Sequence, residues 1–125
     1  MDAQEFEREQ EHMRMLDKNR YTFATVLGAI VEMSDLSIAQ LIGSSRREPL
    51  PVWRKRAYWL GYYGIGLSMA QIGRLAGDRD HTTIGYNLRR HDELLKSNDA
   101  KAHFESAILD QIEETARRIA WKARR

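Results

Sequence analysis

The sequence contains no cysteine, and this absence limits the chemistry available to it. Without cysteine the chain forms neither disulfides nor metal sites built on thiolates. The sequence also lacks an apolar run of about 20 residues, the length that a membrane-spanning helix needs. Its N-terminus is acidic, unlike a secretory signal peptide. We therefore expect a cytoplasmic protein.

Proline is scarce too, with two in 125 residues, and both lie in the segment 43–51 together with glycine and serine. That composition predicts a loop. Elsewhere, hydrophobic residues recur at helical spacing and make up 42% of the chain, while 30% of residues are charged. These values predict one globular domain with an all-α fold of about six helices. The expected helices include residues 22–33, 38–42, 52–63 and 99–121. Ser37 can cap the second of these, and its residues Ile38 and Ile42 should lie in the core. Apolar faces are also expected at Ile72, Leu75 and Ala76 and, in the last helix, at Phe104, Ile108, Ile112 and Ile119.

The net charge of +2 is unevenly spread along the chain. Residues 1–44 hold four basic and eight acidic side chains, a net of −4, whereas residues 45–96 hold ten basic and five acidic ones, a net of +5. A basic surplus is what contacts to phosphates require, although a mixed-charge solvated surface is also consistent with it. We interpret residues 1–20 as an acidic N-terminal extension, either solvated or a helix that docks a partner.

The segment 68–95 has the pattern of a short helix, a tight turn and a longer helix. Ser68 and Asp80 can cap the two helices, and Gly77 lies where the first must end. In the second helix Ile84, Leu88, His91 and Leu95 recur on one face. Three polar residues therefore face outward at its start, where a helix-turn-helix meets base edges in the major groove. These residues are His81, Thr82 and Thr83.

The run Arg79-Asp80-His81-Thr82-Thr83-Ile84, preceded by Leu67-Ser68 and Ile72-Gly73, resembles the signature of the C-terminal DNA-binding domain (domain IV) of DnaA, the bacterial replication initiator. The resemblance extends over most of the chain. It implies a DnaA-like, Trp-repressor-like domain at 21–125, with the helix-turn-helix at 68–95 and a long helix at 99–121. It also implies sequence-specific binding of duplex DNA at DnaA-box-like sites, a nucleoid location, and regulation of replication initiation or transcription.

The resemblance also assigns residues to DNA. Asp80, His81 and Thr82 would read bases and Thr83 would touch the backbone, which suits side chains that bond base edges or meet thymine methyls. Arg46 would enter the minor groove, where a planar guanidinium fits well. The remaining positions would contact the backbone, a thymine methyl or a partner: Arg47, Arg54, Lys55, Ser68, Ala70, Arg89 and Arg90.

Other chemistries are weaker. The sequence has no Gly-x-x-x-x-Gly-Lys-Ser/Thr loop for ATP phosphates, and no nucleophile stands beside a base in a recognisable arrangement. His81 and His91 are ten residues apart, which does not suit two metal ligands on one helix face. We predict no enzymatic activity, no cofactor and no metal.

Two alternatives remain open. Residues 53–63 are rich in aromatics that could stack on single-stranded bases, although we expect them to pack in the core. Asp78 stands where DnaA domains usually have glycine, and Glu48 reduces the charge of the basic loop. Both favour a protein-interaction module that mimics the DnaA domain and binds DnaA or its regulators. A homodimer is also left open.

Overall fold

The computed structural model describes residues 2–9 and 20–123, and within these ranges it contains helices and no strand. The all-α prediction is therefore confirmed. After a short helix at residues 3–9, the chain forms α2 (Phe23–Met33), α3 (Ile38–Ile42), α4 (Leu50–Trp59), the π-helix η1 (Leu60–Ile65), α5 (Met69–Leu75), α6 (His81–Lys96) and α7 (Ala100–Ala123). None of the helices in these ranges is long and apolar enough to cross a membrane.

The helices begin where the sequence places capping side chains. Ser68 Oγ accepts a hydrogen bond from the Gln71 amide at 3.1 Å, and Gln71 Oε1 accepts one from the Ser68 amide at 2.9 Å. Ser37 makes the same reciprocal pair with Gln40 at the start of α3. Asp80 Oδ1 accepts from the Thr82 amide at 2.7 Å at the start of α6. The predicted caps Ser37, Ser68 and Asp80 are confirmed, and each satisfies amides that a helix start leaves free.

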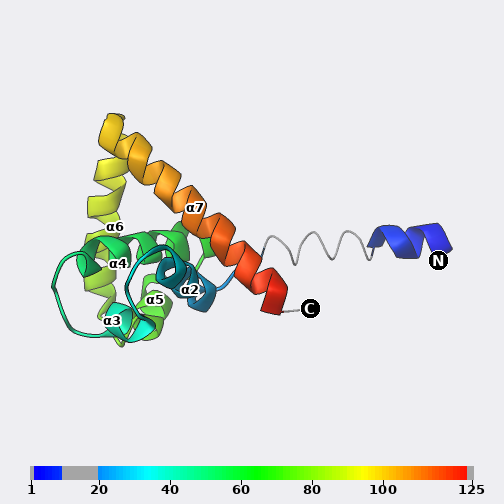
Figure 1. Ribbon diagram of the computed structural model, residues 1–125, viewed down its shortest axis with the longest axis horizontal. Helices are drawn as coiled ribbons and strands as arrows, with labels where there is room; N and C mark the ends of the chain where they lie inside the picture. The colour runs from blue at the N-terminus through cyan, green and yellow to red at the C-terminus, as the bar shows by residue number, and fades with distance from the viewer. Residues whose placement is uncertain (1, 10–19, 124–125) are drawn as a thin grey trace.

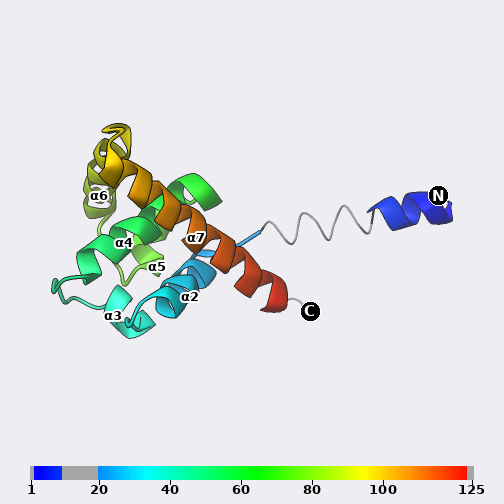
Figure 2. The same cartoon turned by 45° about the horizontal axis from the view of Figure 1, so that its top comes forward.

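The core lies mainly between α2 and α7. Figures 1 and 2 show α7 leaving a sharp corner with α6 and crossing the domain to lie along α2. Val26 and Ile30 of α2 and Ile112 and Ala116 of α7 are fully buried. Ile84 of α6 joins the same core and fixes the helix-turn-helix against it.

The apolar faces predicted for three helices were partly wrong. Phe104 was expected to pack in the core, yet it is 68% exposed, because the buried face at the start of α7 runs through Ala102 and Glu105 instead. Leu75 is 52% exposed, and Ile38 and Ile42 are also exposed. In these short helices only one or two side chains face inward, which leaves the other apolar residues on the surface.

The aromatic segment is divided between core and surface. Tyr58 is buried as expected. The regular α-helix α4 ends at Trp59 and continues as the π-helix η1. The ring centroids of Trp59 and Tyr63 lie 4.2 Å apart. Tyr62 and Tyr63 remain exposed, so the expectation of core packing holds for only part of the segment.

A buried ionic cluster joins α4, α6 and α7. Arg56 donates from Nε and Nη2 to the two carboxylate oxygens of Glu105, each at 2.8 Å. The Nε2 atom of the buried His91 lies 3.0 Å from Glu105 Oε2, so His91 is packed as predicted. Burial alone would raise the pKa of Glu105, but hydrogen bonds from His91 and Arg56 outweigh it and lower this pKa to about 2.

Candidate nucleic-acid interface

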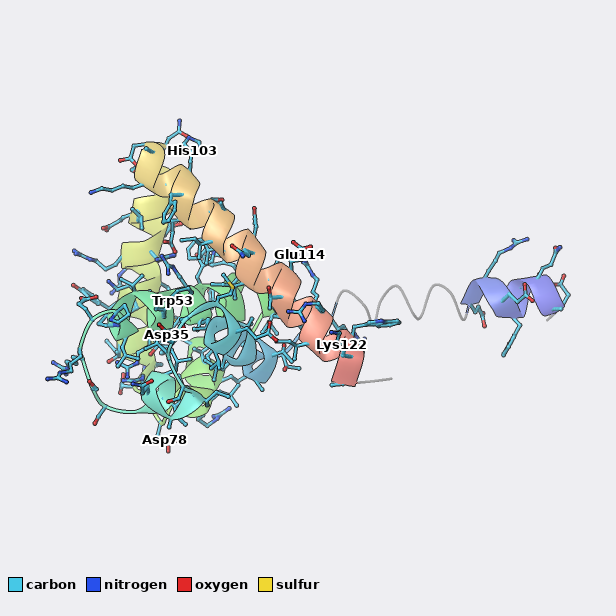
Figure 3. The ribbon with its side chains drawn as sticks, in the orientation of Figure 1. Asp35, Trp53, Asp78, His103, Glu114 and Lys122 are labelled. Atoms are coloured by element: carbon cyan, nitrogen blue, oxygen red, sulfur yellow. The ribbon has the colours of Figure 1, made fainter. Side chains whose placement is uncertain are left out.

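The turn between α5 and α6 is built for close packing. Gly77 has φ 98°, and a Cβ there would overlap the carbonyl of Ile42. Asp78 follows with φ 58°, a region that Asp tolerates better than most residues. The Arg79 amide then donates to the Gly73 carbonyl at 2.8 Å. Figure 3 shows Asp78 at the edge of the molecule, with its side chain directed away from the helices.

The first turn of α6 carries the predicted base-reading side chains, and all of them are exposed. Asp80, His81, Thr82 and Thr83 occupy consecutive positions from the cap onward. His81 Nδ1 lies 3.8 Å from Asp80 Oδ1. The hydrogen bond from the Thr82 amide lowers the pKa of Asp80, so its carboxylate is ionised at neutral pH. An ionised carboxylate only accepts hydrogen bonds, and its match on a base edge is an amino group.

The start of α5 lies beside the middle of α6. Ser68 and Ala70 are exposed there. Arg89 of α6 lines an open hollow of about 180 Å³ together with Met69 and Gly85. Arg89 and Met69, the first residue of α5, therefore line the same hollow, and Met69 lies between the exposed Ser68 and Ala70 in sequence.

Sequence reasoning missed Tyr86. It is 54% exposed on α6, one turn beyond Thr82 and Thr83, and the Arg90 guanidinium lies 5.9 Å from its ring centre. The signal was available, because a large aromatic at a position spaced three or four residues from polar outward residues shares their helix face.

The basic loop carries Arg46 and Arg47, and both are exposed. Figure 1 shows this loop between α3 and α4 bowing away from the helices. Lys55, in the middle of α4, is half-buried. The arginine pair is therefore placed to reach a ligand, while Lys55 is less free to do so.

The assignment of Arg54 to phosphate was wrong. Arg54 is 7% exposed, and its guanidinium donates to the carbonyls of Leu41 at 2.8 Å, Gln40 at 2.7 Å and Gly43 at 2.8 Å, and to that of Ser45. The side chain is thus enclosed by the backbone of α3 and the loop. Its spacing from Leu50, Ala57 and Tyr58 placed it on the buried face of α4, which is the signal that sequence reasoning overlooked.

Arg79 has a related structural role that the sequence did not suggest. Its Nε donates to the Ala76 carbonyl at 3.0 Å, and its Nη2 donates to the Gly43 carbonyl, which also accepts from Arg54. Burial first, and then the positive charge of Arg79, lower the pKa of Arg54. Two like charges are therefore held close together by backbone carbonyls.

Comparison with known proteins bears on what this arrangement does. The family model of the bacterial dnaA protein helix-turn-helix matches residues 23–90, more than half of the chain. The chain belongs to this family. The match includes every residue assigned above to DNA and ends within α6, before α7 begins.

Relatives in the DnaA family come from diverse bacteria. The chromosomal replication initiator protein DnaA of Thermomicrobium roseum is 33% identical over 82 residues, which is 66% of this chain and 18% of the relative. DnaA of Picosynechococcus is 34% identical over 87 residues, 70% of this chain and 19% of the relative. DnaA of Caulobacter vibrioides is 32% identical over 92 residues, with 74% and 19% covered. The chain thus spans about a fifth of the length of these relatives. No solved structure matches.

Membership of the DnaA helix-turn-helix family supports DNA binding, and the family is a DNA-binding rather than a catalytic domain. Within residues 2–9 and 20–123, no group of three or more His, Asp or Glu side chains lies close enough to hold a metal ion.

Proposed function

We propose that this protein binds duplex DNA sequence-specifically at DnaA-box-like sites. The observation that carries the proposal is the exposed run Asp80-His81-Thr82-Thr83 at the start of α6, within a helix-turn-helix of the DnaA family. These side chains offer one ionised acceptor, one imidazole and two hydroxyl–methyl pairs, which together can distinguish base pairs in the major groove. Arg46, exposed on the loop, supplies a guanidinium for the minor groove.

The binding would regulate replication initiation or transcription by occupying initiator sites. No nucleotide-phosphate loop is present in residues 1–125, so this stretch would act without hydrolysing ATP. Exposed Arg47, Arg89 and Arg90, with the half-buried Lys55, would contact phosphates.

A binding titration tests the proposal. A duplex containing TTATCCACA is compared with a scrambled duplex, using the wild type, His81→Ala and Arg46→Ala. Loss of a specific base contact removes about 1–3 kcal/mol of discrimination, so we expect the preference to fall by roughly tenfold or more. His103→Ala is the matched control, because His103 lies at the far tip of α7, where Figure 3 shows it at the corner with α6.

Repeating the titration over a range of salt concentrations separates the kinds of contact. Replacing an arginine that touches phosphate reduces the slope of log K against log salt by about 1 and weakens binding to all duplexes alike. Arg89→Ala is expected to behave in this way, whereas His81→Ala is expected to leave the slope unchanged. Equal binding to both duplexes, or none, would contradict sequence-specific recognition.

One observation favours a second function, that of a protein-interaction module. Three apolar side chains near the turn are exposed, Ile38 and Ile42 from α3 and Leu75 from α5, and Asp78 adds a carboxylate beside them. Such a surface could bind DnaA or one of its regulators and so alter replication initiation. If duplex binding fails, capture of purified DnaA by the wild type but not by Leu75→Glu would support this function instead.

A further inference from the structure

The proposed function requires two parts of the chain to meet DNA at once. Arg46 would occupy the minor groove while the first turn of α6 occupies the major groove. The two parts are about 35 residues apart in sequence and belong to different elements. Since catalytic or binding groups work only when held in the right relative geometry, something must fix the loop against the start of α6.

Arg54 holds the backbone of the loop. Its guanidinium donates to the carbonyls of Gln40 and Leu41 in α3, to that of Gly43 where α3 ends, and to that of Ser45. Ser45 is the residue directly before Arg46. The peptide that carries Arg46 is therefore tied to a buried side chain of α4.

Arg79 ties the start of α6 to the same loop. It precedes Asp80, the cap of α6, and it donates to the Ala76 carbonyl at the end of α5 and to the Gly43 carbonyl of the loop. Gly43 thus accepts from Arg54 and Arg79 on a single oxygen. Beside it, the backbone of Ile42 packs against Gly77 too closely to admit a Cβ.

We propose that Arg54 and Arg79, meeting on the Gly43 carbonyl, form a clamp that sets the position of the minor-groove loop relative to the recognition helix. Arg79 is a positioning residue: it acts on DNA through Arg46 and not by touching DNA itself. This inference rests on the proposed function.

Arg79→Lys is the most informative variant. Lysine keeps the positive charge, but its single ammonium group does not reproduce the fork with which arginine reaches two carbonyls in different directions. A direct phosphate contact would survive this change in large part, whereas a clamp would not. Arg118→Lys is the matched control. Arg118 is exposed near the C-terminal end of α7 and makes one ion pair, with Glu32 of α2.

The first experiment needs no DNA. Trypsin cuts after arginine, so cleavage after Arg46 and Arg47 reports directly on the freedom of the loop. Mass spectrometry of the wild type, Arg79→Lys and Arg118→Lys should show loop cleavage that is several-fold faster in Arg79→Lys alone, with other sites unchanged. Unchanged loop cleavage would overturn the clamp. Faster cleavage at all sites would also overturn it, because it would mean that Arg79 maintains the whole fold.

The second experiment is a double-mutant cycle with the TTATCCACA duplex. We expect Arg79→Lys to raise the dissociation constant about tenfold in the wild-type background but less than about twofold in the Arg46→Ala background. The difference between the two losses is the coupling between Arg79 and Arg46, and its size is usual for two residues that interact. Equal losses in both backgrounds would show that Arg79 acts independently of Arg46, and would overturn the proposal.

The two failures are distinguishable. If the wild type shows no preference for the box duplex, the proposed function fails, and with it the role of the clamp in reading DNA. If the wild type shows the preference and Arg79→Lys retains both affinity and slow loop cleavage, the proposed function stands and the clamp fails.

Discussion

At the scale of single residues, the stability of this domain depends on how its buried charges are paired. Arg54, Lys55 and Arg56 are consecutive and chemically alike, yet Arg54 is enclosed by carbonyls and Arg56 is bound to Glu105. A buried charge is tolerated when it is paired and hydrogen-bonded, and it becomes costly when one partner is removed.

Glu105→Ala tests this dependence. It would leave Arg56 and His91 facing a cavity inside the domain, so we expect the free energy of unfolding to fall by about 3–5 kcal/mol. Urea denaturation followed by circular dichroism measures the change. Glu114→Ala is the matched control on the same helix, since Figure 3 shows Glu114 directed outward, and its effect should stay within about 0.5 kcal/mol. Similar losses in both variants would show that the cluster does not stabilise the domain.

The same carboxylate predicts a pH dependence. The pKa of Glu105 is lowered from 4.5 to about 2 in the folded protein, where Arg56 and His91 face it. Its contribution to stability is therefore complete above about pH 4.5 and is lost as the pH falls from there through about 2. The difference in unfolding free energy between the wild type and Glu105→Gln should shrink across this range. A difference that stays constant from pH 6 to pH 2 would contradict the assignment.

The sequence predicts the role of a residue where that role depends on residues close to it in the chain. The caps Ser68 and Asp80 were predictable, because a hydroxyl or carboxylate before a helix satisfies amides within the next three residues. The partners of Arg54 and Arg56 were not, because Glu105 lies 49 residues from Arg56 and only the folded backbone brings them together. Helical spacing from Leu50, Ala57 and Tyr58 did place Arg54 on the buried face of α4, and that was the one usable signal.

At the scale of elements, the turn of the helix-turn-helix depends on Gly77. Two penalties meet there: φ is 98°, and a Cβ would overlap the Ile42 carbonyl. Gly66 has a similar φ of 90° but no atom within 4 Å of an added Cβ. The two glycines therefore separate backbone strain from steric overlap.

We expect Gly66→Ala to lower the free energy of unfolding by about 1–2 kcal/mol, the cost of a left-handed alanine. Gly77→Ala should cost clearly more, because α3 must also move away from the turn. Thermal or urea denaturation of both variants provides the comparison. Equal destabilisation would mean that the contact with Ile42 has no energetic weight.

The positions of the elements along the chain were predictable to within a few residues, but which of their faces are buried was less so. The stripe expected on α7 included Phe104, whereas the buried stripe runs through Ala102, Glu105 and Leu109. Hydrophobicity favours a phenylalanine over a glutamate for the core. The ion pair with Arg56 reverses that order, and no pattern within α7 reveals it.

At the scale of the whole molecule, α7 is the element that completes the domain. The match to the DnaA helix-turn-helix family ends at residue 90, yet α7 supplies Leu109, Ile112, Ala116 and Ala120 to the core that α2 also builds. Helical spacing predicted a long final helix, but its path across α2 depends on contacts between the two ends of the domain.

If α7 belongs to one cooperative unit with the helix-turn-helix, a cavity in α7 should destabilise everything together. Ile112 is fully buried, and Ile112→Ala should lower the free energy of unfolding by about 2–5 kcal/mol. Phe104→Ala, on the same helix but exposed, should change it by no more than about 0.5 kcal/mol. Trp121 lies in α7 itself, so fluorescence is measured in a Trp121→Phe background, where Trp53 and Trp59 of α4 are the reporters. This signal and circular dichroism should report the same shifted midpoint. If the fluorescence transition stays in place while the circular dichroism transition shifts, α7 unfolds separately and the domain is not a single unit.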